Sequence, residues 1–302
     1  MSGVSTRTSL DDLAATGAAA RLGLRERDAE DLAAVADRVR QRRDARAEVE
    51  RLAGWLREGI GTFPGEPQGP SWPGYEPGAD PFGTGVLPLL ALVATEPDLV
   101  AFHRSRGVPA EVSAATLREL GQQVWVHRLT FGTFGLHTYG WLPVTWSGSL
   151  YWLGRLQVNL QVLEGGARVC STHIPRSGPL TPDAVDDSFA RAAAFFPAHF
   201  PDKPVQDLWC SSWLLDPTLA QGLDPASNMA RFQSRWRLYG DPMPADEDAL
   251  FFTFASRGEV DLDELPRATS LQRLVADRLR GGGHWSSCTG LVPLGQVGQE
   301  VR

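Results

Sequence analysis

The stretch from Tyr151 to Ala193 holds the residue types whose spacing could do chemistry. A β-rich run reaches His173, a loop rich in Gly and Pro follows, and Thr181 with the proline after it is a helix-start signal. Threonine is a good N-cap, and proline suits the first helical turn because its missing N–H has no partner there. A strand, a Gly/Pro loop and a helix N-terminus can hold an anion, since free backbone N–H groups and the helix dipole converge.

His173 is the first candidate for proton transfer, because the unperturbed pKa of histidine lies near neutral pH. Its alternative role is a hydrogen bond to the backbone that fixes the loop. Ser211 and Ser212 alternate on the next expected strand, so one of them faces the same side as the site, and Ser212 is the candidate relay of a proton. The alternative for this residue is a satisfied core serine. Cys210 could act as a nucleophile, but a small buried hydrophobe is the commoner fate of a free cysteine.

The elements that must position these residues alternate between strand and helix. Glu164-Gly-Gly166 predicts a hairpin between two strands, and proline after aspartate predicts helix starts at Asp216 and Asp224. The expected strands are 151–163, 167–174, 207–215, 249–255 and 289–292, and the expected helices are 182–197, 227–236 and 270–280.

Residues 1–125 are expected to form a separate helical domain. Apolar residues recur at helical spacing, as at Leu32, Val35 and Val39, and Ser113 is read as an N-cap. A Pro/Gly-rich connection over 62–85 carries Trp72, among other aromatic residues, and is expected to pack on the domain. Residues 126–302 then form the mixed part, so the fold class is α/β (α+β), with a domain boundary at 125/126.

Composition narrows the classes of function. The 302-residue chain is 42% apolar and 22% charged, which is globular, and its formal net charge of −7 speaks against a nucleic-acid partner. The cysteines, 170, 210 and 288, show no paired spacing, and His127 and His137 lack supporting ligands, so no metal is expected. No leader peptide is visible, and the longest apolar run, Val86–Val93, is shorter than a membrane span, so a cytoplasmic protein without membrane contact is expected.

The second half of the chain resembles the GNAT superfamily of acyl-CoA-dependent N-acyltransferases. More narrowly, it is similar to two-part bacterial acyltransferases that have a helical N-terminal domain and a GNAT-like C-terminal domain. The resemblance spans roughly 126–294. It is carried by Leu153-Gly-Arg-Leu-Gln157, His173-Ile-Pro175 with Gly178-Pro-Leu180, Ser188 with Phe195-Phe196, Ser212-Trp-Leu-Leu-Asp-Pro217, Ser227-Asn228 with Phe232-Gln233, and Leu271-Gln272-Arg273.

The resemblance implies acyl transfer from acetyl-CoA or another acyl-CoA to a small-molecule amine by direct attack on the thioester. His173 would be the base, Ser212 a relay and Tyr239 the acid near sulfur. Cofactor contacts would come from the strand and loop through Ser171, Thr172, Ile174, Arg176, Ser177, Gly178, Leu180 and Thr181, and from the next helix through Asn228 and Phe232. The resemblance does not determine the acyl group, the amine or the oligomeric state.

The chain departs from the superfamily pattern at two places. The loop after Ile174 lacks the usual Arg/Gln-x-x-Gly-x-Gly/Ala spacing, and three aspartates, 183, 186 and 187, would compete with a diphosphate. Arg235 stands seven residues after Asn228, where a tyrosine is usual, and Tyr239 follows four residues later. These departures favour the alternative of a catalytically silent binding protein, whereas the His-Ile-Pro and Ser-Asn motifs favour an enzyme.

Overall fold

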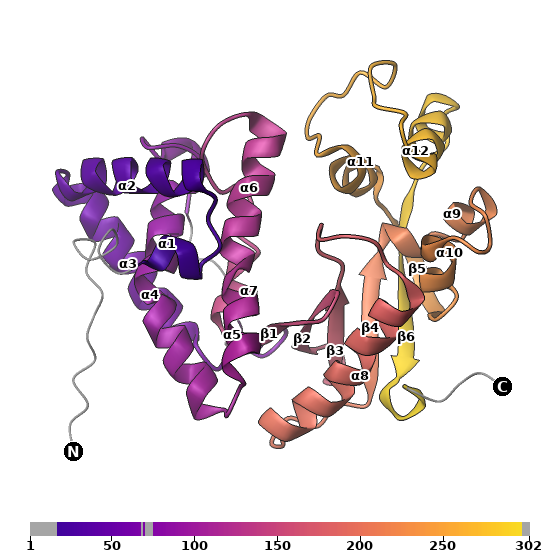
Figure 1. Ribbon diagram of the computed structural model, residues 1–302, viewed down its shortest axis with the longest axis horizontal. Helices are drawn as coiled ribbons and strands as arrows, with labels where there is room; N and C mark the ends of the chain where they lie inside the picture. The colour runs from indigo at the N-terminus through magenta and orange to yellow at the C-terminus, as the bar shows by residue number, and fades with distance from the viewer. Residues whose placement is uncertain (1–16, 68, 70–74, 298–302) are drawn as a thin grey trace. The chain divides into compact units, whose positions relative to one another are not determined.

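The computed structural model describes residues 17–297 except 68 and 70–74, so Trp72 and the N-terminal segment in which no leader is expected lie outside the described residues. The chain forms two compact units. One comprises Met1–Tyr151 with Leu160–Glu164, and the other comprises Trp152–Asn159 with Gly165–Arg302 (Figure 1). The first unit is helical and the second combines helices with a sheet, which confirms the expected fold class.

The helical unit is built around amphipathic helices. The predicted stripe of Leu32, Val35 and Val39 is buried in α2, and Val49 and Leu52 are buried in α3. The helices are α1 (Ala18–Arg21), α2 (Glu26–Arg40), α3 (Arg43–Gly59), η2 (Pro77–Ala79), α4 (Val86–Ser105), α5 (Ala110–Leu117), α6 (Glu119–Phe131) and α7 (Leu142–Trp146).

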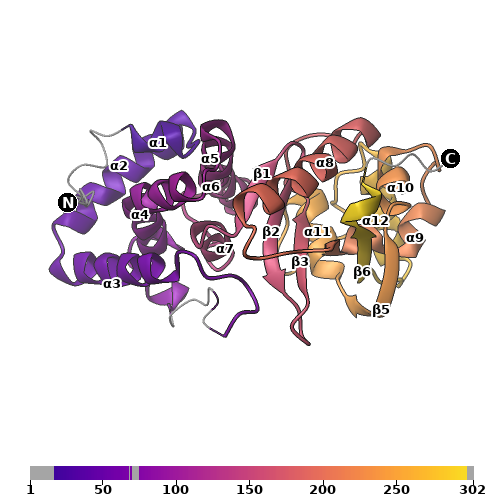
Figure 2. The same ribbon diagram turned by 90° about the horizontal axis from the view of Figure 1, so that it is seen from below.

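Helix α4 is the core helix of this unit. It lies among the other helices (Figure 2), and residues such as Leu89, Leu90 and Leu99 are fully buried. The 20-residue helix is long and apolar enough to cross a membrane by length and composition alone. However, 72% of its apolar 18-residue window is buried inside the protein. The helix thus extends beyond the apolar run Val86–Val93. Pro88 does not interrupt it, because this proline falls in the first turn, where proline is tolerated.

Two expectations for this part of the chain differ from the structure. Ser113 is not an N-cap: it lies inside α5, which begins after Pro109, and its Oγ lies 2.8 Å from Nδ1 of the buried His103. The proposed domain boundary at 125/126 falls within α6, and the division into units comes after Tyr151 instead.

The sheet is mixed, as expected. Its six strands have the order β1-β2-β3-β4-β6-β5. The central strands β3 and β4 are parallel, whereas β6 runs antiparallel to both β4 and β5. The strands are β1 (Leu150–Leu153), β2 (Leu156–Val162), β3 (Arg168–His173), β4 (Asp207–Ser212), β5 (Arg237–Pro244) and β6 (Ser286–Pro293).

Helix α8 (Pro182–His199) packs along one face of the central strands (Figures 1 and 2). It begins after Thr181, as predicted, and Asp216 and Thr269 also cap helices. The other helices of this unit are η3 (Trp213–Leu215), α9 (Pro217–Gln221), α10 (Asn228–Gln233), α11 (Asp246–Phe254), α12 (Ser270–Arg280) and η4 (Leu294–Gln296).

Three predicted elements are wrong in detail. The first arm of the hairpin is two strands, because the chain turns at Gly154, whose φ is +75°. The predicted strand over 249–255 is helix α11, which has three acidic residues in its first turn, and Asp246 accepts the Trp285 N–H at 2.6 Å. The strand predicted over 207–215 ends at Ser212 and becomes a 3-10 turn.

Candidate active site

The two parallel strands at the centre of the sheet stay paired over only part of their length. Their register joins Cys170 to Leu208 and Ser171 to Trp209, and among the described residues the recorded pairing stops there. β3 nevertheless continues to His173 and β4 continues to Ser212. The backbone groups at the end of β3 are therefore not committed to the ladder with β4.

Polar side chains of β3 and β4 lie on one face of the sheet. Side chains alternate along a strand, and residues in register on neighbouring strands share a face. The pairing of Ser171 with Trp209 therefore places His173 and Ser211 on that same face, whereas Thr172 points to the other.

His173 is held by Asn159 of β2. The Nε2 atom lies 2.5 Å from Asn159 Oδ1 and 3.3 Å from Ser171 Oγ. An amide oxygen can only accept a hydrogen bond, so the proton of the neutral imidazole resides on Nε2 and the lone pair on Nδ1. Asn159 thus fixes both the orientation of the ring and its tautomer.

Burial keeps this imidazole neutral. It lowers the pKa of His173 from the ordinary 6.5 to about 4, because the charged form loses its hydration. At neutral pH the ring can accept a proton or a hydrogen bond. Its Nε2 contacts one side chain of β2 and one of β3, the strand that carries His173, and the alternative role, a hydrogen bond to the backbone that fixes the loop, stays a prediction.

Ser212 is on the wrong face for a proton relay with His173. Alternation places it on the side of Leu208 and Cys210, and its Oγ accepts the Leu214 N–H at 3.2 Å as the N-cap of η3. Its neighbour Ser211 lies on the histidine's face. Of the two adjacent serines, Ser211 and not Ser212 therefore shares the face of His173.

Ser211 belongs to a row of hydroxyl groups on that face. Its Oγ lies 3.2 Å from the Oγ of Ser287 and 3.5 Å from Oγ1 of Thr289, both on β6. Tyr239 of β5 is paired with Thr289, and its hydroxyl accepts the indole N–H of Trp209 at 2.8 Å. Tyr239 is 45% exposed, so its hydroxyl can still donate its own proton.

Most other residues expected to contact a cofactor lie between the end of β3 and the start of α8. Ser171 and Thr172 are buried, and the Thr172 hydroxyl has no hydrogen-bond partner among the described residues. Ile174 is half-buried, and Leu180 is buried. Ser177 is exposed, and its N–H donates to the Pro175 carbonyl at 2.9 Å.

The loop before α8 depends on Gly178. Its φ of +131° is a conformation that L side chains rarely adopt, and a Cβ there would meet nothing within 4 Å. Thr181 has the extended backbone of an N-cap, but its side chain makes no capping hydrogen bond. Arg176 is exposed and donates from Nη1 to the carbonyl of Phe252 at 3.2 Å, so its guanidinium is directed to α11.

A further arginine contacts the loop from outside it. Arg155, in the β1–β2 turn, donates from Nη2 to the Gly178 carbonyl at 2.7 Å. Its Nε donates to the carbonyls of Gly178 and Pro179 at 3.1 and 3.2 Å. All three hydrogen bonds of its guanidinium therefore go to the loop.

Helix α10 supplies the remaining two candidates. Asn228 is its first residue and is half-buried, and Ser227 caps the helix by accepting the Ala230 N–H at 3.3 Å. Phe232 is only 1% exposed, and its ring lies 5.8 Å from that of Trp236. Phe232 is thus a core residue in this structure.

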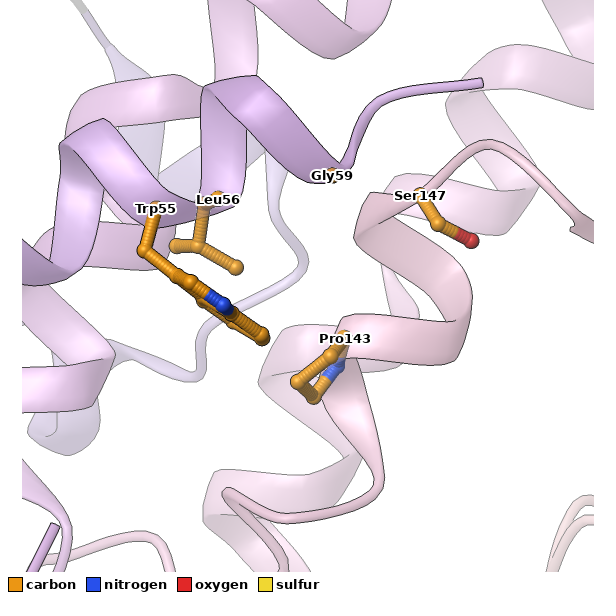
Figure 3. Close-up of a pocket in the computed structure, with 5 residues that line it drawn as sticks. All are labelled: Trp55, Leu56, Gly59, Pro143 and Ser147. Atoms are coloured by element: carbon orange, nitrogen blue, oxygen red, sulfur yellow. The ribbon is translucent and has the colours of Figure 1, made fainter. Parts of the chain in front are cut away.

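The pocket drawn in Figure 3 lies elsewhere, in the helical unit. Its cavity volume is about 10 Å³, room for about one water molecule, and none of its lining residues is titratable. The lining comprises Trp55, Leu56, Gly59, Pro143 and Ser147. Among the described residues there is also no group of three or more His, Cys, Asp and Glu side chains that could hold a metal ion.

Comparison with known proteins assigns both halves of the chain. Residues 14–148 match the N-acyltransferase N-terminal domain, and residues 150–292 match the GNAT-like C-terminal domain. The chain belongs to the two-part GNAT-type acyltransferases. The family resemblance expected from the sequence is confirmed, and the protein is an enzyme of the acyltransferase class.

Solved structures support the same assignment. An acyltransferase in complex with decanoyl-CoA and teicoplanin is 36% identical, with a TM-score of 0.80, and the match covers 91% of this chain and 86% of that one. A tryptophan-to-alanine acyltransferase mutant in complex with octanoyl-CoA is 34% identical, with a TM-score of 0.83, and the match covers 94% and 93%. No curated protein matches the chain.

Two residues of the site were not assigned their roles from sequence. Asn159 lies in β2 and is 1% exposed, and a buried amide within a strand is a signal that a partner must exist. Arg155 belongs to a motif of the family resemblance, but its contact with the loop joins residues more than 20 positions apart. No local pattern in the sequence indicates that pairing.

Proposed function

We propose that this acyltransferase moves a medium-chain acyl group from coenzyme A to an amine of a small-molecule acceptor. The observation that carries the proposal is the neutral, oriented imidazole of His173 at the end of β3, where that strand has left its pairing with β4. The family assignment supports acyl transfer, and the solved relatives bound to decanoyl-CoA and octanoyl-CoA support a chain longer than acetyl.

Several parts of this chain would hold the acyl-CoA. The backbone at the end of β3, at Thr172, would hydrogen-bond the pantetheine arm, since the recorded pairing with β4 stops before it. The loop Pro175–Thr181 and the first turn of α8 would face the diphosphate, because the first N–H groups of a helix have no partner within it. Bound there, acyl-CoA supplies the activated thioester.

His173 would receive the proton that the acceptor nitrogen loses. With a pKa of about 4, the ring cannot hold a proton from a free ammonium group at neutral pH. It can accept a hydrogen bond from a neutral amine and take the proton as the C–N bond forms, when the nitrogen becomes more acidic. Asn159 would keep the ring in the orientation that presents Nδ1.

Tyr239 would give a proton to the departing thiolate. Its hydroxyl accepts from Trp209 and thus keeps its own hydrogen for donation. Ser211 and Thr289 lie in the same face and could hydrogen-bond the acceptor beside His173. Because one solved relative is in complex with teicoplanin, we propose a glycopeptide-like small molecule with a free amine as the acceptor.

The test is a matched set of transfer assays. Octanoyl-CoA, decanoyl-CoA and acetyl-CoA are each incubated with an amine-bearing glycopeptide, and the released thiol and the mass of the acceptor are followed. The proposal expects an acceptor heavier by one acyl group, with kcat/KM higher for the octanoyl and decanoyl donors than for acetyl. Thiol release without acylated acceptor would mean hydrolysis, and binding of acyl-CoA without thiol release would mean a silent binding protein.

A further inference from the structure

The turn between β1 and β2 carries a cation, Arg155, whose hydrogen-bond partners within the described part of the chain are all backbone carbonyls. Arg155 makes three contacts of 2.7–3.2 Å to the oxygens of Gly178 and Pro179. Among the described residues it has no carboxylate partner, and its third nitrogen, Nη1, is buried without a hydrogen-bond partner. Burial lowers the pKa of this guanidinium below its ordinary value. An incompletely satisfied, partly buried cation is costly unless it serves a negative ligand.

The contact between Arg155 and the Pro179 carbonyl also determines the direction of the Leu180 N–H in the loop. In a trans peptide the C=O and the N–H point in opposite directions. The Pro179 carbonyl points at Arg155, so the N–H of Leu180 points away from it. Fixing that carbonyl therefore fixes a backbone donor in the segment that leads into α8.

The same turn is attached to the start of α8. The N–H groups of Arg155 and Leu156 donate to the Ser188 hydroxyl at 2.8 and 3.3 Å, and that hydroxyl donates to the Ala184 carbonyl at 2.8 Å. One turn thus holds both the loop and the first turns of the helix whose free N–H groups follow it. Arg176, the arginine within the loop, is directed at Phe252 instead.

We propose that Arg155 is a positioning residue for the diphosphate of coenzyme A: it holds the Leu180 N–H and the N-terminus of α8 toward the anion and supplies a positive charge, unpaired with any carboxylate, behind them. This inference rests on the proposed function, since it assumes acyl-CoA as the donor. It explains how a loop without the usual superfamily glycine spacing could still serve a diphosphate, because the geometry is imposed by a side chain from another turn.

The experiment separates the nucleotide half of the cofactor, which carries the diphosphate, from the pantetheine half. Coenzyme A binding is measured by calorimetry for the wild type, Arg155→Gln, Arg155→Lys and, as a control, Arg280→Gln. Arg280 is an exposed arginine of α12 that pairs with Asp263. KM is measured in parallel with octanoyl-CoA and with octanoyl-pantetheine, which lacks the diphosphate. Circular dichroism and thermal unfolding check that each variant is folded.

We expect Arg155→Gln to raise the Kd of coenzyme A and the KM of octanoyl-CoA by roughly tenfold, the size of a charge-assisted hydrogen bond. The KM of octanoyl-pantetheine and kcat should stay within about twofold, Arg155→Lys should recover part of the loss, and Arg280→Gln should match the wild type.

Two results for the variants would overturn the inference. Unchanged coenzyme A affinity in Arg155→Gln would do so, and so would an equal loss for octanoyl-CoA and octanoyl-pantetheine, which would show a structural role alone. The wild-type protein separates the hypothesis of a diphosphate site from the proposed transferase function. If it accepts both donors equally, the diphosphate site is wrong and the transferase function stands. If it neither binds nor uses either donor, the proposed function fails as well.

Discussion

Arg235, which follows α10, donates from Nη2 to both carboxylate oxygens of Asp186 in α8, at 2.7 and 2.8 Å. The same group also reaches the Pro182 carbonyl at 3.3 Å. In sequence these residues looked unfavourable for binding a diphosphate, since Asp186 adds negative charge near the helix start and Arg235 replaces a usual tyrosine. In the structure the arginine neutralises the aspartate, and Arg191 does the same for Asp187 at 2.7 Å.

This pairing predicts a double-mutant result. Arg235→Gln leaves the Asp186 charge uncompensated near the proposed diphosphate position, so coenzyme A should bind about two- to fivefold more weakly, the range for a mostly exposed ion pair. Adding Asp186→Asn should restore the affinity. Calorimetry of both single variants and of the double variant measures the coupling, and it should shrink at high salt. If the double variant binds as weakly as Arg235→Gln, charge compensation is not the role of this pair.

The contact between His173 and Asn159 predicts a shift in the pH profile. A carboxylate in place of the amide favours the charged imidazole, so Asn159→Asp should raise the pKa of His173 well above about 4. Activity should then fall on the acid side of neutrality and recover at higher pH, whereas the wild-type rate should show no loss from this group until far lower pH. The measurement is kcat against pH with octanoyl-CoA.

A second variant separates chemistry from packing in that contact. His173→Gln should lower kcat by roughly 10²-fold, the usual size of a proton-transfer contribution, with little change in coenzyme A affinity. An unchanged kcat in this variant would remove His173 from the proposed role, whatever the pH profile of Asn159→Asp.

The two adjacent serines of β4 should respond differently to substitution. Ser212 caps η3, so Ser212→Ala should cost about 0.5–2 kcal/mol of unfolding free energy and leave kcat nearly unchanged. Ser211 is exposed on the face of His173, so Ser211→Ala should leave stability nearly unchanged and raise the KM of the acceptor. Urea unfolding and acceptor titrations distinguish the two, and the reverse pattern would exchange their roles.

These serines illustrate how far sequence reasoning reached. Alternation shows that one of two neighbours faces the site, but the choice depends on the register between β3 and β4, which joins Ser171 to Trp209 across a long connection. The helix starts at Thr181 and Asp216 are local signals and were predicted correctly. The segment 249–255 was misread because its apolar run fits either structure, and Asp246 decides it through a contact with Trp285, distant in sequence.

Three histidines with lowered pKa values predict an acid-sensitive fold. Burial lowers the pKa of His103, His127 and His173 from 6.5 to about 4, and Arg128 lowers that of His127 further. Between these two pH values the unfolded chain binds more protons than the folded one, so the free energy of unfolding is fully present above about pH 6.5 and decreases as the pH falls. Each histidine contributes at most about 1.4 kcal/mol per pH unit in that window.

The measurement is urea unfolding at a series of pH values from 7.5 to 4.5. The wild type should lose stability steadily below pH 6.5, and the slope divided by 2.303RT gives the number of protons taken up on unfolding. His103→Gln should reduce that number by close to one, whatever it does to stability at pH 7.5. Substitution of the exposed His284, which pairs with Asp246 at the surface, serves as the matched control and should leave the slope below pH 6.5 steeper than in His103→Gln. A wild-type free energy that stays flat between pH 6.5 and 4.5 would contradict the burial of neutral imidazoles described above.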